Sequence, residues 1–493
     1  MRLQLPMLDS LATSQRSIVP PQTPHDVYFN AIPIEVNCAT HSFDLYQFEM
    51  SRVDGDEALD FETAFRVSDG LTSVSRSLLS RHLQDASLAR LFNRGLLSEK
   101  LQNAPPRQET KGTLSDIEIN VSQTCNLGCN YCCVGQGEFG KPPTRLSSST
   151  ASTAIDQLVE RSGAKEHTIT FFGGEPLLNF PVVRACVKHT KHLEKEHNRT
   201  FRFRILTNGT AFTTENVSFI KSHNIALQIS IDGSRESHNR WRIFRGGGAT
   251  YDKIVTAIGD YFSDYLDKVT IRATMARGNL NALVAYKEIR SLGFNNIIVA
   301  HANGSNQASS YSHDELTELR DGYTQLARYF LEEAILTRSI RAIGPPFNEH
   351  MRVIAQGKRK ESYCGAGVHF VGLSARGEYA YCQDLAENAL AGAGDIISGL
   401  NEQAIKHYLS ESSGVDKRPV CSTCWAKYVC GGGCAALAFI ENGDVARPYT
   451  PDCEMIRHNI GLAARIISEL QHSCPTAFFD WLPANFHDQL MHT

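Results

Sequence analysis

The chain has 493 residues, which is too long for one ordinary hydrophobic core and predicts two to four domains. Its formal net charge of −4 and its pI near 6.5 argue against general binding to nucleic acids or to anionic membranes. No apolar stretch is long enough to span a membrane, and the N-terminal segment MRLQLPMLDSLATSQ lacks an apolar core of signal-peptide length, so we expect a cytoplasmic protein.

The N-terminal part of the chain predicts a flexible segment followed by a small domain. Residues 1–25 are rich in Ser, Pro, Gln and Thr, a composition typical of loosely ordered chain. The segments AIPIEVN, from Ala31, and SFDLYQFEM predict a β-hairpin, and helical stretches such as SVSRSLLSRHL follow. Strands followed by three short helices predict a small α+β domain over 26–100. The double proline and the charges of residues 101–114 predict a linker.

Residues 115–343 alternate between apolar segments and amphipathic helical stretches. The expected strands cover 116–121, 167–172, 201–206, 225–231, 268–275 and 295–300. Apolar strands separated by amphipathic helices predict parallel βα units. Six units are too few for a closed eight-stranded barrel, so the predicted fold class is α/β with an open, partial (β/α)6 barrel. Ligands of such folds bind at the carboxyl ends of the strands.

The C-terminal part loses this alternation. Residues 344–460 are rich in glycine and cysteine, a composition that predicts a small domain organised by metal more than by a large apolar core. Residues 461–493 contain the amphipathic stretch IRHNIGLAARIISELQH, which predicts a helix, and an aromatic-bearing tail.

Three cysteines directly after the first expected barrel strand indicate a metal site. Cys125, Cys129 and Cys132 are spaced C-x3-C-x2-C, and in a reducing compartment cysteines are more often metal ligands or nucleophiles than disulfide partners. Three thiolates this close can hold three irons of a cubane cluster and leave the fourth iron open to a ligand. A zinc site or a chance triplet is also compatible with the spacing. We interpret the adjacent Cys133 as structural.

Polar motifs follow the next strands in order. In FFGGEP, the glycines Gly173 and Gly174 allow close approach to a ligand, and Glu175 offers a carboxylate to a cationic amine. The motifs LTNGT and SIDG place hydrogen-bonding groups, suited to ribose hydroxyls and a carboxylate, at the barrel mouth: Thr207, Asn208, Ser230 and Asp232. Arg272 lies inside an apolar strand and needs a partner, either a ligand carboxylate or a structural acid. Ordinary turn chemistry is the alternative for each motif.

The cysteine triplet, the aromatic Tyr131 within it and the ordered strand-end motifs resemble the signature of radical S-adenosylmethionine (radical SAM) enzymes. The resemblance implies that Cys125, Cys129 and Cys132 hold a [4Fe–4S] cluster whose open iron binds SAM. It also implies that the segment containing Glu175 contacts the methionine amino group. Tyr131 and the strand-end residues named above would complete the cofactor site.

A second cysteine pattern occupies the C-terminal part. It reads Cys364-x17-Cys382, then C-x2-C-x5-C-x3-C, then x18 to Cys453, and it resembles a SPASM domain, which carries two auxiliary [4Fe–4S] clusters. The resemblance implies one cluster on Cys421, Cys424, Cys430 and Cys453 and another on Cys364, Cys382 and Cys434. Seven cysteines cannot fill eight sites, so one auxiliary iron is open or takes another ligand. A pair of zinc knuckles is the alternative. Asp384 is a candidate proton acceptor, or simply a solvated acid.

The resemblance is closest to SPASM maturases that form thioether cross-links in ribosomally made peptides, of the sactipeptide and ranthipeptide types. It implies cleavage of SAM to a 5′-deoxyadenosyl radical, a precursor peptide with a leader sequence, and a low-potential electron donor of flavodoxin or ferredoxin type. Residues 26–100 would be a winged-helix-like module that binds the leader through an added strand. The alternatives are an anaerobic sulfatase-type (formylglycine) maturase, a cyclophane-forming maturase and a zinc-stabilised peptide-binding protein without radical chemistry.

Overall fold

The computed structural model describes residues 114–481, apart from 305, 341–342, 356–359, 389–391, 413 and 423, together with six short strands between residues 26 and 98. The expected hairpin is confirmed, because β2 (Ala31–Val36) pairs antiparallel with β3 (Ala39–Asp44), which pairs with β4 (Met50–Asp54). β1 (Asp26–Phe29) pairs with β5 (Ser73–Ser75) and β6 (Leu97–Ser98) in a second sheet. The three helices expected over 26–100 lie outside the described residues.

A third, mixed sheet organises the part of the chain from residue 114 onward, in the order β12-β11-β10-β9-β8-β7-β13-β14-β15-β16. Its first six strands are parallel and lie within one residue of the expected bounds at each end, which confirms the open partial barrel. They are β7 (Asp116–Ser122), β8 (Glu166–Gly173), β9 (Thr200–Thr207), β10 (Ala226–Ser230), β11 (Val269–Met275) and β12 (Asn296–His301).

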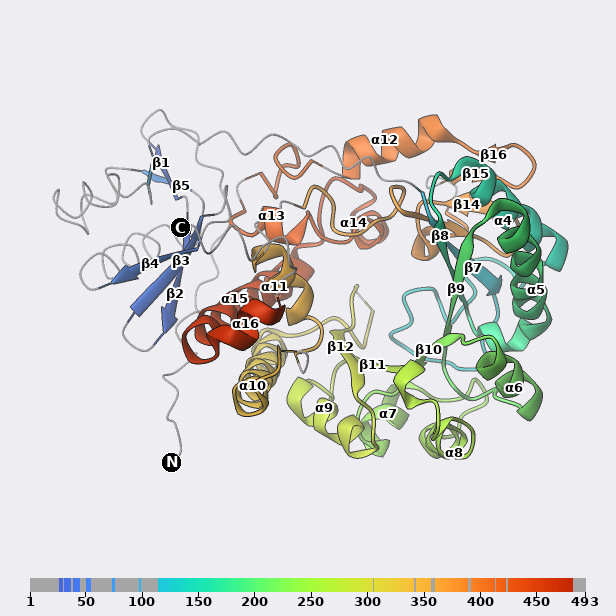
Figure 1. The fold of residues 1–493 in the computed structure, drawn as a ribbon, viewed down its shortest axis with the longest axis horizontal. Helices are drawn as coiled ribbons and strands as arrows, with labels where there is room; N and C mark the ends of the chain where they lie inside the picture. The colour runs from blue at the N-terminus through green and yellow to red at the C-terminus, as the bar shows by residue number, and fades with distance from the viewer. Residues whose placement is uncertain are drawn as a thin grey trace.

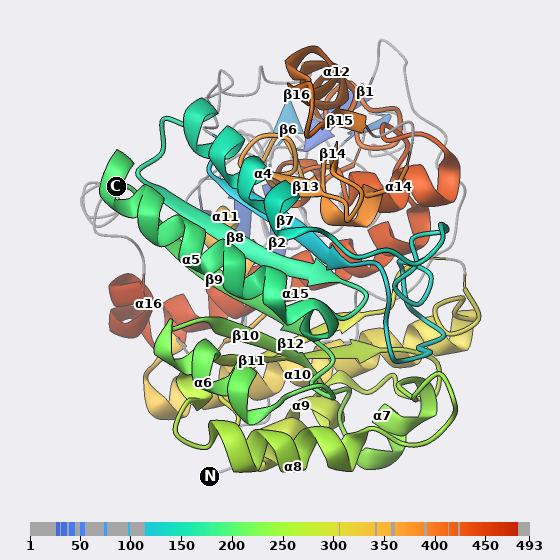
Figure 2. The ribbon, with the colours of Figure 1, turned by 90° about the vertical axis from the view of Figure 1, so that its right-hand side faces the viewer.

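Helices cover the outer side of these strands (Figures 1 and 2). They are α4 (Ser148–Arg161), α5 (Phe180–His197), α6 (Thr214–Ser222), α7 (Arg235–Trp241), α8 (Tyr251–Phe262), α9 (Ala282–Ser291) and α10 (His313–Thr337). Capping boxes start α6 at Thr213 and α10 at Ser312, where each side chain accepts from the backbone of the third helical residue.

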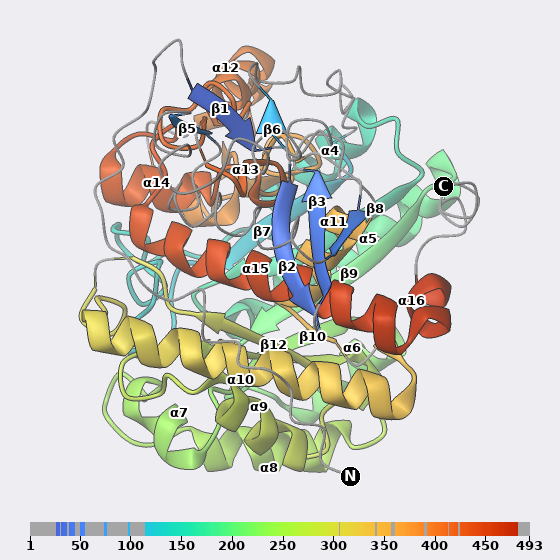
Figure 3. The same ribbon diagram turned by 90° about the vertical axis from the view of Figure 1, so that its left-hand side faces the viewer.

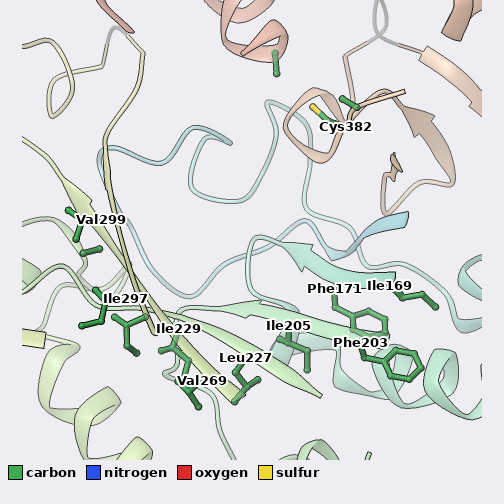
Figure 4. Close-up of a cluster of buried hydrophobic side chains, with 14 of the residues drawn as sticks. Ile169, Phe171, Phe203, Ile205, Leu227, Ile229, Val269, Ile297, Val299 and Cys382 are labelled. Atoms are coloured by element: carbon green, nitrogen blue, oxygen red, sulfur yellow. The ribbon is translucent and has the colours of Figure 1, made fainter. Parts of the chain in front are cut away.

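The period of two along each strand divides its side chains between two faces. The apolar residues labelled in Figure 4, such as Ile169, Phe171 and Phe203, are buried and form the core between sheet and helices. The intervening side chains lie on the opposite side, which we call the inner face. It carries polar and charged residues, among them Arg204 and Arg272, which are exposed. The sheet therefore encloses an apolar core on one side and a polar interior on the other.

The cysteine-rich segment continues the same sheet. β13 (Phe370–Leu373) pairs parallel with β7, and β14 (Glu378–Ala380), β15 (Gly392–Asp395) and β16 (Gly399–Leu400) follow antiparallel. The helices of this part are α11 (Phe347–Ala355), α12 (Glu402–Ser412), α13 (Lys427–Cys430), α14 (Ala435–Asn442), α15 (Thr450–Ser473) and α16 (Pro475–Trp481).

Helix α15 links several parts of the molecule. It packs against α10 and α11, and the N-terminal strand β2 lies against it (Figure 3). Because α15 runs unbroken from Thr450 to Ser473, the boundary expected after residue 460 lies within one helix. None of the described helices combines the length and the apolar composition needed to cross a bilayer.

Candidate functional site

The loop that follows β7 carries Cys125, Cys129 and Cys132. Burial raises the pKa of Cys125 to about 11 and that of Cys129 to about 12, and the negative charge of Cys132 adds to both shifts. The three thiols therefore lie within electrostatic range of one another. The backbone N–H of Leu127 points at Cys125 Sγ at 3.4 Å, and the Asn208 side-chain amide lies 3.6 Å from the same sulfur.

This donor set fits an iron–sulfur cluster. Three thiols on one loop can each bind a different iron. Hydrogen bonds from N–H groups to a sulfur ligand tune the reduction potential of the cluster. Within the described residues, no group of three or more His, Cys, Asp or Glu side chains forms a site for a single metal ion. A cubane does not require such convergence on one atom, because its thiolates bind separate irons.

The glycines of FFGGEP pack on the cysteine loop. Gly174 N donates to Ser122 O at 2.7 Å, and Glu175 N donates to Thr124 O at 2.9 Å. A Cβ on Gly173 would lie 2.2 Å from Ser122 O, and one on Gly174 would lie 2.3 Å from Thr124 O. Gly173 also has φ +128°, which side chains rarely adopt. The close approach that we expected toward a ligand is thus made here by the protein's own loop.

Glu175 is fully buried and receives only neutral donors. Its carboxylate accepts from Leu177 N at 3.0 Å, Thr207 Oγ1 at 2.7 Å and Asn208 N at 2.8 Å. Burial raises the pKa of Glu175 to about 7. No Lys, Arg or His of the described ranges pairs with it, so a ligand cation would find an uncompensated carboxylate beside the cysteine loop.

The third strand end also holds the cysteine loop. Asn208 Nδ2 donates to Asn126 Oδ1 at 2.9 Å, Asn126 Nδ2 donates to Thr210 Oγ1 at 2.8 Å, and Thr210 Oγ1 donates to Asn208 Oδ1 at 2.6 Å. This closed ring of hydrogen bonds fixes the loop after β9 against the residue that follows Cys125. Thr207 and Asn208 therefore lie where the sequence predicts them, next to the triplet and to Glu175.

Residues 119–280 match the sequence profile of the radical SAM superfamily. This segment is a radical SAM domain. The chain is 28% identical over 144 residues to the radical SAM cyclopropyl synthase TigE of Paramaledivibacter caminithermalis, covering 27% of this chain and 30% of that protein. It is 28% identical over 154 residues to a cysteine-type anaerobic sulfatase-maturating enzyme of Clostridium novyi, covering 30% of this chain and 40% of the relative. The matches thus span well under half of either relative.

The fold is shared over a longer range. The solved structure of histidine-tagged anSMEcpe with bound AdoMet aligns with a TM-score of 0.62 at 17% sequence identity, covering 73% of this chain and 98% of that one. At this identity the likeness concerns the fold, and it covers more of the chain than the radical SAM domain alone.

Two residues predicted to bind the cofactor are held in a buried clamp inside the radical SAM domain. The Tyr131 hydroxyl donates to Asp232 Oδ2, and Arg242 Nε donates to the same oxygen at 2.9 Å. Thr274 N donates to Asp232 Oδ1 at 2.9 Å, and the Arg242 guanidinium lies 5.2 Å from the centre of the Tyr131 ring. Both carboxylate oxygens are thus engaged by the protein. The observed role of the Tyr131 and Asp232 side chains is to anchor the cysteine loop to β10 and β11.

Ser230 and Arg272 lie side by side on neighbouring strands of the radical SAM domain. They are register partners in the β10–β11 pairing, and Ser230 is half-buried at the end of its strand. Arg272 lies within the apolar strand, as expected, and is exposed on the inner face, whereas its neighbours Ile271 and Ala273 point to the core. Its charge opposes the increase that burial causes in the pKa of Asp384.

Four of the later cysteines gather around α13. Burial raises the pKa of Cys421 to about 11 and that of Cys430 to about 12, and the charge of Cys424 adds to both. Burial also raises the pKa of Cys453, with Cys430 and Cys424 adding to the shift. These four thiols therefore form one group.

The remaining three gather beside the barrel. Burial raises the pKa of Cys382 far above its usual value, and the charges of Asp384, Cys434 and Cys364 contribute in that order. Burial raises the pKa of Cys434 to about 12, with the charges of Asp384 and Cys364 adding to it. These charge effects are compatible with the two groups that the resemblance implies, and they place Asp384 near Cys382 and Cys434.

Two charged side chains that we did not single out in the sequence hold the cysteine-bearing segments in place. Arg418 is buried, and its guanidinium donates to the carbonyls of Gly432 at 2.7 Å, Val445 at 2.8 Å, Ala446 at 3.0 Å and Ser412 at 3.3 Å. It therefore ties together the loops on both sides of α13 and α14. The sequence feature that could have identified Arg418 is its position three residues before Cys421.

Glu387 locks the cysteine loop of the radical SAM domain to the segment after Cys382. Its buried carboxylate accepts from Gln123 Nε2 at 2.9 Å and pairs with Lys141 at 3.1 Å and Arg376 at 3.2 Å. Its backbone has φ +68°, a conformation unfavourable for a residue other than glycine. These contacts span the radical SAM loop and the cysteine-rich part.

Proposed function

We propose that this protein is a radical SAM enzyme that oxidatively modifies a ribosomally made precursor peptide, and that it forms a thioether cross-link. One observation carries the proposal most directly. A radical SAM domain shares its sheet with a segment that holds seven further cysteines. With clusters bound to these cysteines, the segment would supply electron acceptors next to the site where a substrate radical would form.

In this proposal Cys125, Cys129 and Cys132 hold the first [4Fe–4S] cluster, and Glu175 binds the amino group of SAM. SAM supplies the chemistry by yielding methionine and a 5′-deoxyadenosyl radical when it is reduced. The surrounding residues position the cofactor. Thr207 and Asn208 orient Glu175. The substrate would lie against the polar inner face, where Arg204 and Arg272 are exposed. We retain Ser230 and Arg272 as candidate contacts of the SAM ribose and carboxylate.

The later cysteines would serve as an electron sink. Thioether formation removes two electrons from the peptide, so an acceptor is chemically required. We assign one auxiliary cluster to Cys421, Cys424, Cys430 and Cys453. The other would use Cys364, Cys382 and Cys434, which leaves one iron for a non-cysteine ligand or a substrate thiolate. Asp384 lies at the group of three and is our candidate proton acceptor.

A formylglycine-forming maturase is the second candidate. One observation favours it: the match to a cysteine-type anaerobic sulfatase-maturating enzyme. It also removes two electrons from its substrate and would use the same site. Incubation with a cysteine-bearing peptide separates the two candidates by mass spectrometry. A thioether product loses two hydrogen atoms and keeps its sulfur, whereas a formylglycine product from cysteine has lost the sulfur.

Iron content tests the assignment of the clusters. Anaerobically purified protein should contain about twelve irons per chain if three four-iron clusters are present. Replacing Cys125, Cys129 and Cys132 by alanine should remove about a third of this iron. Replacing Cys364, Cys382 and Cys434 should remove another third. Cys186→Ala is the matched control, since this buried thiol lies on α5 within the apolar core. A colourless protein with stoichiometric zinc would contradict the proposal.

A further inference from the structure

Four side chains rich in hydrogen-bond acceptors meet on the inner face beside the cysteine loop. Gln383 N lies 3.5 Å from Glu118 Oε2, and Asn120 Nδ2 lies 3.5 Å from Gln383 O. Asp384 is the next residue along the chain and raises the pKa of Glu118 by its charge, after the larger effect of burial. We call Glu118, Asn120, Gln383 and Asp384 the acceptor cluster. It joins β7 to η5 (Gln383–Leu385).

Two carbonyl oxygens of the acceptor cluster lack donors. Asn120 is 0% exposed and its Oδ1 has no hydrogen-bond partner among the described residues. Gln383 is half-buried, and its Oε1 atom is likewise buried without such a partner. A buried acceptor without a donor costs free energy, so native proteins rarely leave one unless a ligand or water supplies the bond. Since both atoms are acceptors, the missing partner must supply N–H or O–H groups.

Groups of both kinds surround the acceptor cluster. Burial raises the pKa of Glu118 to about 7, and Arg204 lies near enough to oppose that shift, as Arg272 opposes the one at Asp384. Neither guanidinium forms an ion pair or hydrogen bond through its side chain with any described residue. Unpaired acceptors therefore lie near unpaired donors, which matches a ligand that carries both kinds of group.

The acceptor cluster lies close to the reactive part of the molecule. Cys133, next to Cys132, is within electrostatic range of Asp384 and Arg272. Glu118 and Asp384 also contribute to the electrostatics of Cys364 and Cys382. A group bound here would therefore lie between the radical SAM loop and the auxiliary group of three cysteines.

We propose that the acceptor cluster binds main-chain amides of the substrate peptide. Asn120 and Gln383 accept from its N–H groups, and Arg204 donates to one of its C=O groups. This proposal rests on the proposed function and adds how the substrate is held. Amide recognition reads an extended backbone rather than a particular side chain, so the enzyme tolerates varied sequences around the modified residue.

An ester scan tests this proposal by binding alone. The probes are a blocked hexapeptide of alanine and glycine and five versions, each with one main-chain amide replaced by an ester, which removes a single N–H. Isothermal titration calorimetry measures their affinity for the anaerobic holoenzyme with SAM. At least one ester should bind about three- to tenfold more weakly than the all-amide peptide, the usual effect of losing one neutral hydrogen bond.

Two variants connect the ester effect to the acceptor cluster. Asn120→Leu should weaken the all-amide peptide about three- to tenfold and abolish the preference over one ester, and Gln383→Met should do so for an N–H of the same or an adjacent residue. Gln228→Met, on the inner face of β10, is the control and should retain wild-type affinities. All variants are compared at equal iron content.

Equal affinity for every ester, absence of measurable peptide binding, or wild-type binding by Asn120→Leu would overturn the proposal. The proposed function fails by a different observation, since peptide binding needs no cleavage of SAM. A wild-type protein that binds the probes and never forms 5′-deoxyadenosine would leave the amide site standing and reject the radical chemistry.

Discussion

The buried pair of Asp232 and Arg242 offers the most quantitative test of how the cysteine loop is held. Asp232→Asn preserves the shape of the side chain and removes the charge that Arg242 faces. The two side chains are only 2% and 10% exposed, so water cannot replace the lost partner. Removing one member of a buried pair costs about 3–5 kcal/mol. At about 2–4 °C per kcal/mol for a domain of this size, the variant should melt about 6–20 °C below wild type.

Differential scanning calorimetry of anaerobic protein measures this difference, with iron content recorded for each sample. The double variant Asp232→Leu with Arg242→Met removes both charges and should recover more than half of the loss, because neither charge is left buried alone. Tyr131→Phe removes one hydrogen bond and should cost about 1 kcal/mol. A melting temperature of Asp232→Asn within about 2 °C of wild type, or a double variant no more stable than the single one, would refute the reasoning.

Three further predictions concern groups around the clusters. Since burial raises the pKa of Glu175 from 4.5 to about 7, the folded metal-free protein holds a proton that the unfolded chain releases, and its stability should fall as pH rises through that window. Glu175→Gln should flatten this part of the pH profile in urea unfolding, and an unchanged slope would contradict the shift. Glu387→Gln should weaken the pairs with Lys141 and Arg376 and speed the loss of loop-bound iron to a chelator, with Glu402→Gln as an exposed control. Arg418→Met should cost about 3 kcal/mol or more and release auxiliary iron first; uniform release from all clusters would argue against this local role.

The barrel strands could be predicted from the sequence because their signal is local. Apolar residues at every second position, separated by amphipathic stretches, located each strand to within one residue at either end. The parallel pairing of β13 with β7 could not be predicted in this way. More than two hundred residues separate the two strands, and the local sequence of neither strand specifies which strand it pairs with.

In the candidate site, too, local features could be predicted from the sequence, whereas contacts between distant segments could not. The cysteine triplet and Glu175 are recognisable because their spacing and order are properties of a short segment. The partner of Asp232 could not be chosen, since an Asp-Gly turn looks the same whether its carboxylate faces a ligand or a buried arginine. Glu118 and Asn120 resemble ordinary polar positions of a strand. Their significance depends on Gln383, which only the fold brings to them.

Formation of 5′-deoxyadenosine from SAM is the most direct test of the central claim. Wild-type protein reduced with dithionite under anaerobic conditions should form it, and Cys125→Ala should abolish it while retaining the iron of the two auxiliary groups. Unchanged cleavage by Cys125→Ala, or no cleavage by iron-replete wild type, would contradict the assignment of Cys125, Cys129 and Cys132 as the SAM-cleaving site.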